Sequence, residues 1–158
     1  MKHIKSCIVG LSLAINLVYS GAALSATTGS VILRDKDNAI CNLPAPAPGG
    51  RVIYNLTQQQ GCKDWNDRAR SFQLAELPSS SFVVFSDNSL NCGISATYYY
   101  LLRTIKKQTS TPIIEFEYLQ TFTHWQIIKP GLILEYGYSN TNPRDKLTCV
   151  EITTSPTP

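Results

Sequence analysis

Two glutamates, Glu115 and Glu117, are the residues with the clearest potential for chemistry in this sequence. In a β-strand, residues two apart share one face, and their backbones lie about 6–7 Å apart. Two carboxylates at such a separation can serve a glycosidase, so a small secreted hydrolase is one alternative function. Glutamates that alternate with Ile114, Phe116 and Tyr118 are also typical of the solvent side of a half-buried strand, and we favour this second interpretation.

The first 26 residues have the organisation of a secretory signal peptide. Lys2 and Lys5 supply the positive start, and an apolar stretch follows over residues 7–19. That stretch is shorter than the roughly 20 residues of a membrane span, and no later segment approaches this length. Cleavage is expected after one of three small residues, Ala23, Ser25 or Ala26. The sequence thus predicts a secreted or periplasmic protein with no membrane span after signal cleavage.

The mature chain has about 132 residues, the size of one domain. Two of the 14 Lys and Arg residues belong to the signal segment, and 11 Asp and Glu residues oppose the remainder. The mature protein is therefore close to neutral. A nucleic-acid partner usually requires a clustered basic surface, so we expect none.

Four cysteines remain after the signal segment: Cys41, Cys62, Cys92 and Cys149. An even number in an exported chain predicts two disulfides, and three pairings are open from the count alone. A metal site of cysteines and histidines is disfavoured, because no C-x-x-C pair occurs and the mature chain has only His124.

His124 lies in the aromatic segment "FTHWQII", where packing or a surface position is expected rather than catalysis. The sequence therefore predicts a protein that is not an enzyme.

Short segments rich in β-branched and aromatic residues dominate the mature chain. Gly, Pro, Asn, Asp or Ser residues separate them, and no window keeps a helical period over three turns. We expect an all-β domain over residues 27–152 and a flexible tail over 153–158. The expected strands are 31–33, 51–56, 71–77, 82–85, 98–105, 113–119, 124–128, 132–138 and 148–152.

Two pairs of segments align as an imperfect internal repeat. "VILRDKDNAIC" (31–41) matches "VVFSDNSLNC" (83–92), since each is an apolar strand followed by an acidic turn and a cysteine. "WNDRARSFQL" (65–74) matches "NPRDKLTCVEI" (142–152), since each is a polar loop that runs into a strand. The second unit is about 26 residues longer, as if it held an added hairpin. The repeat predicts two related Greek-key motifs packed face to face.

This organisation resembles the βγ-crystallin fold, including its microbial secreted members. In that family a unit opens with a strand and a turn like "VTLYEDxNF" and closes with a loop of the form [ND]-[ND]-x-x-[ST]-S. Here "NDRARS" (66–71) and "FVVFSDNS" (82–89) follow in that order and at that spacing. The resemblance covers residues 31–92 well and residues 93–152 weakly. It implies a disulfide-stabilised Greek-key β-sandwich, and pairing within units implies the disulfides Cys41–Cys62 and Cys92–Cys149.

The resemblance also implies two calcium-binding loops, in which a backbone carbonyl and a hydroxyl contribute oxygen ligands. The candidate ligands here are Asp67, Asp145 and Thr148, with Asp35, Asp37 and Asp87 in the opposing turns. Both loops depart from the pattern. Arg70 stands where the first loop needs a hydroxyl, and Arg144 begins the second loop. We therefore expect no cofactor and a structural role for Asp67 and Asp145, with a calcium-stabilised envelope protein as the alternative.

Recognition of another macromolecule is the leading functional expectation, because the second half of the chain is rich in Tyr and Trp. Exported members of the resembled family include protease inhibitors and killer-toxin-like proteins, which implies a secreted inhibitor or toxin-like effector. An inhibitor would present a stiff loop, for which residues 44–50, "PAPAPGG", are suited. The candidate binding residues are Pro44, Pro46, Pro48, Tyr99, Trp125 and Tyr136.

Overall fold

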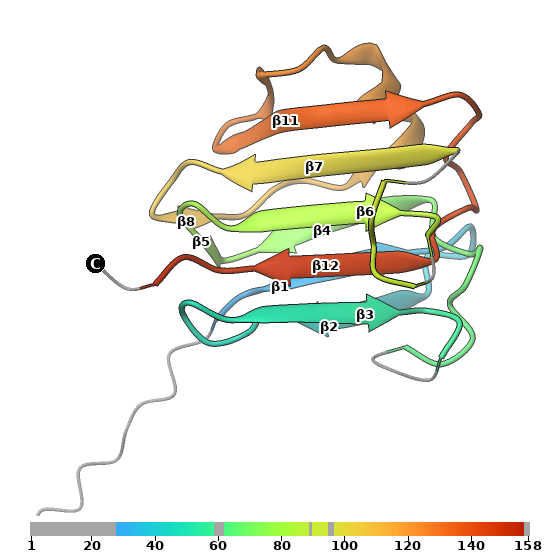
Figure 1. Ribbon diagram of the computed structural model, residues 1–158, viewed down its shortest axis with the longest axis horizontal. Helices are drawn as coiled ribbons and strands as arrows, with labels where there is room; N and C mark the ends of the chain where they lie inside the picture. Colours follow the sequence, from blue (N-terminus) through green and yellow to red (C-terminus); the bar gives the residue numbers. More distant parts are fainter. Residues whose placement is uncertain (1–27, 59–61, 89, 95–96, 157–158) are drawn as a thin grey trace, which may run out of the picture.

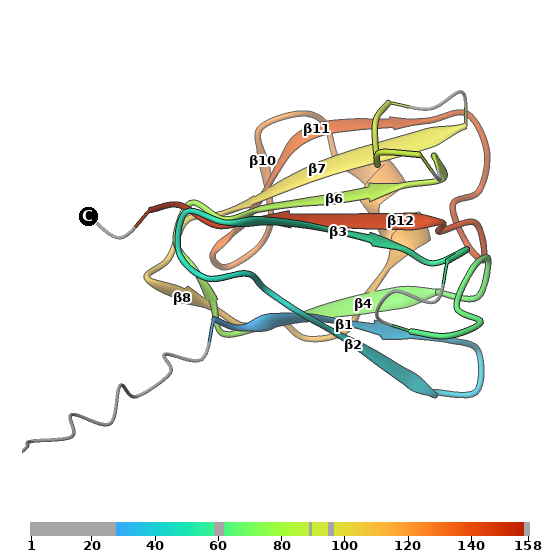
Figure 2. The same ribbon diagram turned by 60° about the horizontal axis from the view of Figure 1, so that its bottom comes forward.

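The structure, a computed structural model, describes residues 28–58, 62–88, 90–94 and 97–156. The expected signal peptide and its cleavage points lie outside this range. Within it the chain forms twelve β-strands and one short 3₁₀ helix, so the expectation of an all-β protein is confirmed (Figure 1). Figure 2 shows the strands in two layers, a four-stranded sheet and a six-stranded sheet, which together form a β-sandwich.

Both sheets are antiparallel throughout. The four-stranded sheet contains, in spatial order, β2 (Ile40–Pro44), β1 (Ser30–Arg34), β4 (Ser71–Ala75) and β9 (Ile114–Glu115). The six-stranded sheet contains, in spatial order, β10 (Gln126–Lys129), β11 (Leu132–Ser139), β7 (Tyr98–Thr104), β6 (Phe82–Ser86), β12 (Cys149–Thr153) and β3 (Arg51–Asn55). Two short strands, β5 (Leu77–Pro78) and β8 (Gln108–Thr109), pair with each other at one end.

The strand order divides the sandwich into two units of four strands. In the first unit β1, β2 and β4 share one sheet, and β3 crosses to the other sheet, where it pairs with β12. In the second unit β6, β7 and β12 share the six-stranded sheet, and β9 crosses to pair with β4. Each unit thus donates its third strand to the sheet of the other, and the β10–β11 hairpin extends the second unit.

Side chains from both sheets meet in one apolar core. Three fully buried rings lie at its centre: Phe72 from β4, Phe85 from β6 and Phe116 from the 3₁₀ helix. Their centroids are 4.7 Å apart for Phe72–Phe85, 5.3 Å for Phe72–Phe116 and 5.0 Å for Phe85–Phe116. Burial of each ring contributes about 1.5–3 kcal/mol, so this cluster is a main link between the layers.

The expected strand over 113–119 is wrong. Only Ile114 and Glu115 are in a strand, and Phe116–Thr121 form the 3₁₀ helix η1. Phe116 and Leu119 are fully buried and Phe122 packs against the core. This spacing of three places all three on one side of a 3₁₀ helix, which repeats every three residues.

Three other boundaries also need correction. Strand β2 was not among the expected strands, and in it the buried Cys41 and Leu43 alternate with exposed neighbours. His124 lies in the turn before β10 rather than in a strand. The tail is anchored further than expected, because Thr153 ends β12 and the buried Thr154 donates its backbone N–H to Gly50 O at 3.0 Å. The expected flexible tail is therefore wrong for residues 153 and 154.

Two disulfides join Cys41 to Cys62 and Cys92 to Cys149, the pairing within units that the repeat implied. Each contributes about 2–4 kcal/mol, chiefly by restricting the unfolded chain. Disulfides are typical of proteins that fold in an oxidising compartment outside the cytoplasm. Among the described residues, no helix has the length and apolar character that a bilayer crossing requires.

Candidate binding surface

One face of the sandwich carries more apolar side chains than the solvent-facing side of a sheet normally does. It is the face of the six-stranded sheet that points away from the four-stranded sheet, which we call the outer face and which Figure 1 views directly. Strand β7 defines the two sides, because Tyr98, Tyr100 and Leu102 are buried in the core. The alternate residues Tyr99 and Leu101 therefore point outward.

Residues directly opposite each other on antiparallel strands share a face, so the strand register identifies the whole outer face. Its residues form three rows across the sheet. The rows are Tyr138-Tyr99-Ser86-Cys149-Asn55, then Tyr136-Leu101-Val84-Glu151-Ile53, then Ile127-Ile133-Arg103-Phe82-Thr153-Arg51. An antiparallel sheet with one side toward solvent normally alternates apolar and polar residues. Here most outward positions on β6, β7, β10 and β11 are apolar as well.

A disulfide holds a loop over part of the outer face. Cys149 is in β12 and Cys92 is in the loop after β6, and their bond fixes this loop across the sheet in Figure 1. The Ser86 hydroxyl adds a hydrogen bond to Gly93 O at 2.8 Å. Val84, Cys92 and Cys149 are buried together, with Ile53, Tyr99 and Leu101 packed against them. The loop covers this half of the outer face and leaves the β10–β11 half uncovered.

An aromatic cluster begins at Tyr99, at the border of the covered half, and continues over the uncovered half. The ring centroids of Tyr99 and Tyr136 are 6.0 Å apart, and His124 stacks on Tyr136 at 4.7 Å. Ile127 beside them is 60% exposed and Trp125, in the preceding turn, is 67% exposed. Burial, with smaller effects from Glu151 and Tyr136, raises the pKa of Tyr99, so its phenol keeps its proton at neutral pH. The structure thus brings Tyr99 and Tyr136 together, with Trp125 beginning the neighbouring hairpin.

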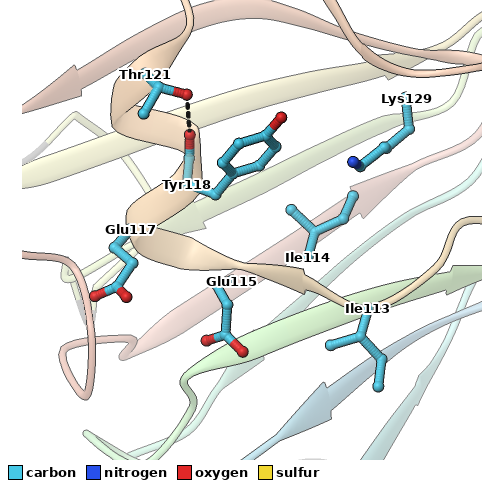
Figure 3. A pocket seen from close by; sticks show the side chains of 7 residues that line it. All are labelled: Ile113, Ile114, Glu115, Glu117, Tyr118, Thr121 and Lys129. Carbon is cyan, nitrogen blue, oxygen red and sulfur yellow. Dashed lines mark hydrogen bonds between the residues drawn. The ribbon is translucent and has the colours of Figure 1, made fainter.

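Glu115 and Glu117 lie at a different place, the edge where η1 spans from β9 towards β10. They line a pocket of about 500 Å³ with Ile113, Tyr118 and Lys129 (Figure 3). Lys129 lies across the pocket from both glutamates, with its ammonium 5.1 Å from the Tyr118 ring centroid.

The pairing that the hydrolase alternative required is wrong in its geometry. Glu115 is the last residue of β9, whereas Glu117 is in η1, so they do not share the face of one strand. Glu117 also accepts a hydrogen bond from Arg144 Nη2 at 2.5 Å. Glu117 therefore forms an ion pair with Arg144, which lies in the loop before β12.

The two loops considered for calcium are placed symmetrically against each other. Asp67 and Asp145 have the same left-handed backbone, each with a φ of 54°. Asp67 donates its N–H to Leu147 O at 3.1 Å, and Asp145 donates its N–H to Ala69 O at 3.2 Å. This reciprocal contact matches the repeat and supports a structural role for both loops.

The side chains in the cleft between these loops do not form a shell of oxygen ligands. Arg70 donates from Nε and Nη2 to both carboxylate oxygens of Asp145 at 2.9–3.1 Å. Arg68 donates to the buried Asp35 at 2.5 Å, which lowers the pKa of that carboxyl group. A guanidinium has no acceptor atom, so neither arginine side chain can supply an oxygen ligand to a calcium ion. Among the described residues, no set of three or more His, Cys, Asp or Glu side chains is grouped as a metal site.

The remaining predicted site residues are in a separate part of the fold. Pro44 ends β2, and Pro46 and Pro48 follow in the connection to β3. This connection is tied to the C-terminal segment, since Gly49 N–H donates to Ser155 O at 3.0 Å. It is a surface loop, as expected, but it does not join the aromatic cluster of the outer face.

Comparison of the chain with protein families, curated proteins and solved structures finds no match. The outer face is therefore the feature of the molecule that bears most directly on function. Several of its residues are not among the predicted binding residues, above all Leu101, Ile127 and the pair Arg51 and Glu151. The signal that could have found them is the run of consecutive apolar residues in "FVVF" and "YYYLL", since a strand with one solvated face has no need for apolar residues on both sides.

Proposed function

We propose that this protein is an exported, disulfide-stabilised binding protein of the βγ-crystallin type that acts without catalysis on a macromolecule outside the cytoplasm. The assignment of fold type is supported by the strand order, in which two four-stranded units each place one strand in the sheet of the other. The reciprocal hydrogen bonds between the Asp67 and Asp145 loops support it as well.

The observation that carries the binding function is the apolar, aromatic outer face. Interface cores are enriched in aromatic residues and depleted of charged ones, and large exposed apolar patches mark interaction sites. The charged residues of this face are paired: Arg51 with Glu151, and Arg103 with Glu135 at the β11 bulge. When a partner covers Tyr136, Tyr138 and Ile127, each of these charged groups keeps its partner within the protein.

A secreted inhibitor or toxin-like effector is the role that the family resemblance suggests. Such proteins act by occupying a surface of their target, and a rigid sheet is well suited to this because little conformational entropy is lost on binding. In this proposal the outer face makes the contact, rather than the anchored loop over residues 44–50.

Affinity capture with the mature, disulfide-bonded protein tests the proposal. The bait is incubated with culture medium and cell-surface extracts of the source organism and its neighbours. We expect a captured partner whose binding is lost in the double variant Ile127→Asp/Tyr136→Ser. The matched control is Ile40→Asp, which adds the same charge at an exposed isoleucine on β2, in the opposite sheet.

Circular dichroism first verifies that both variants keep the fold of the parent. A partner that binds the double variant as tightly as the parent would place the contact elsewhere and overturn the proposal. The proposal would also be overturned if no captured molecule binds the parent protein in a saturable way.

A further inference from the structure

A pocket lies on the outer face, between the disulfide-held loop and the sheet. It has a volume of about 470 Å³, within the range of small-molecule sites. Its floor is apolar, with Phe82 and Val84 from β6 and Leu101 from β7. Asn91, Cys92 and Gly93 line it from the loop, so the Cys92–Cys149 disulfide fixes one wall. The pocket is thus formed before any ligand arrives.

The polar part of this pocket is the ion pair between Arg51 and Glu151, which has no net charge. Arg51 donates from Nε to Glu151 Oε1 at 2.6 Å and from Nη2 to Glu151 Oε2 at 2.8 Å. The Arg51 side chain is 57% exposed, whereas that of Glu151 is only 15% exposed. A guanidinium has five N–H donors and a carboxylate about four acceptor positions, so both groups keep capacity for a ligand. Because the two charges cancel, neither an anion nor a cation is selected.

Tyr99 completes the pocket from the side of the aromatic cluster. Its ring faces outward beside Leu101, and its protonated hydroxyl can donate a hydrogen bond. The pocket therefore combines an apolar floor, an aromatic ring and a neutral rim of paired donors and acceptors. A purely apolar ligand would leave the Arg51–Glu151 pair buried without new partners, which is costly.

We propose that this pocket binds a neutral saccharide unit, so that the macromolecular partner of the outer face is recognised through a glycan. A pyranose ring has an apolar C–H face that packs on Tyr99 and the floor. Its hydroxyls are both donors and acceptors, and a vicinal pair matches the paired oxygens and nitrogens of Glu151 and Arg51. The inference rests on the proposed function, since it names the chemistry of the partner at the same face.

Isothermal titration of the mature protein with neutral cello-, chito-, malto- and manno-tetrasaccharides tests the inference. We expect at least one of them to bind, and Glu151→Gln to weaken it about tenfold or more, because a hydrogen bond to a charged group is lost. The matched control is Glu117→Gln, which neutralises another arginine-paired carboxylate at a distant pocket and should leave the affinity unchanged.

Two results would overturn the saccharide inference: no tetrasaccharide binds, or Glu151→Gln binds as tightly as the parent. A separate arm treats the captured partner with glycosidases. If the partner still binds the outer face after its glycans are removed, the contact is with protein and the inference fails while the proposed function stands. If the Ile127→Asp/Tyr136→Ser variant captures the partner as well as the parent does, the proposed function itself fails.

Discussion

Arg70 determines the chemistry of the cleft between the two related loops. Its position in the first loop corresponds to that of Thr148 in the second, because the N–H groups of Asp67 and Asp145 contact Leu147 and Ala69 reciprocally. A hydroxyl at residue 70 would add an oxygen beside Asp145, whereas the guanidinium neutralises that carboxylate directly. The positive charge next to Asp145 in this cleft is thus a side chain of the protein itself.

Replacement of Arg70 by threonine should make the protein responsive to calcium. We expect the parent to have the same melting temperature in excess Ca²⁺ and in chelator. Arg70→Thr should melt at a lower temperature in chelator, because Asp145 loses its partner, and Ca²⁺ should recover part of the loss by binding the folded state. Differential scanning calorimetry with and without Ca²⁺ measures both effects.

Arg51→Thr is the matched control, since it removes another arginine–carboxylate pair on the opposite side of the molecule. Its melting temperature should not depend on Ca²⁺. A parent protein that melts higher in Ca²⁺ than in chelator would refute the self-neutralised cleft and favour the calcium-stabilised alternative.

At the scale of elements, helix η1 shows what sequence periodicity can and cannot predict. The alternation Ile114, Phe116, Tyr118 favours a strand, but burial follows Phe116, Leu119 and Phe122. Both patterns are present in the same segment, and the contacts of Phe116 with Phe72 and Phe85 across the core are not apparent from the local sequence. Strands with a single clear pattern, such as β4 and β12, were predicted to within two residues at their ends.

The candidate site was also predictable only in part, because residue type is visible in the sequence and strand register is not. Tyr99 and Tyr136 could be selected by residue type, because tyrosine is favoured in recognition surfaces. Their neighbours on the outer face depend on strand register and on the β-bulge after Leu134, which shifts Tyr136 to face outward. A bulge adds one residue and is not apparent from alternation alone. The ion pair of Arg51 with Glu151 joins residues 100 positions apart, which no local pattern reveals.

Phe116 should be the residue on which the attachment of η1 depends. Phe116→Ala should lower the free energy of unfolding by about 3–5 kcal/mol, because it empties a fully enclosed position between the two sheets. Phe122→Ala, in a half-buried ring at the other end of η1, should cost about 1–2 kcal/mol. Urea denaturation followed by circular dichroism measures both. Equal losses in the two variants would show that η1 is not anchored through Phe116.

At the scale of the whole molecule, exchange of strands interlocks the two units. Among the strands that the structure describes, β3 pairs only with β12 and β9 pairs only with β4. The central ring cluster also combines Phe72 of the first unit with Phe85 and Phe116 of the second. Each unit contains its own disulfide, yet neither has a complete sheet or core without the other. We therefore expect the two units to unfold together as one cooperative domain.

Separation of the units between Ser79 and Ser80 should abolish folding of each half. We expect fragments 28–79 and 80–156, each with its disulfide formed, to show far-UV circular dichroism of unfolded chains. In a Trp125→Phe variant of the intact protein, fluorescence of the buried Trp65 reports on the first unit, and near-UV circular dichroism of the buried Tyr98 and Tyr100 reports on the second. Both signals should change at the same urea concentration, as two-state unfolding requires.

When the fragments are mixed, β3 and β9 regain their partners, and the spectrum of the intact protein should return. A fragment that melts cooperatively alone would show that its disulfide and local strands suffice, and would refute the interlocked domain.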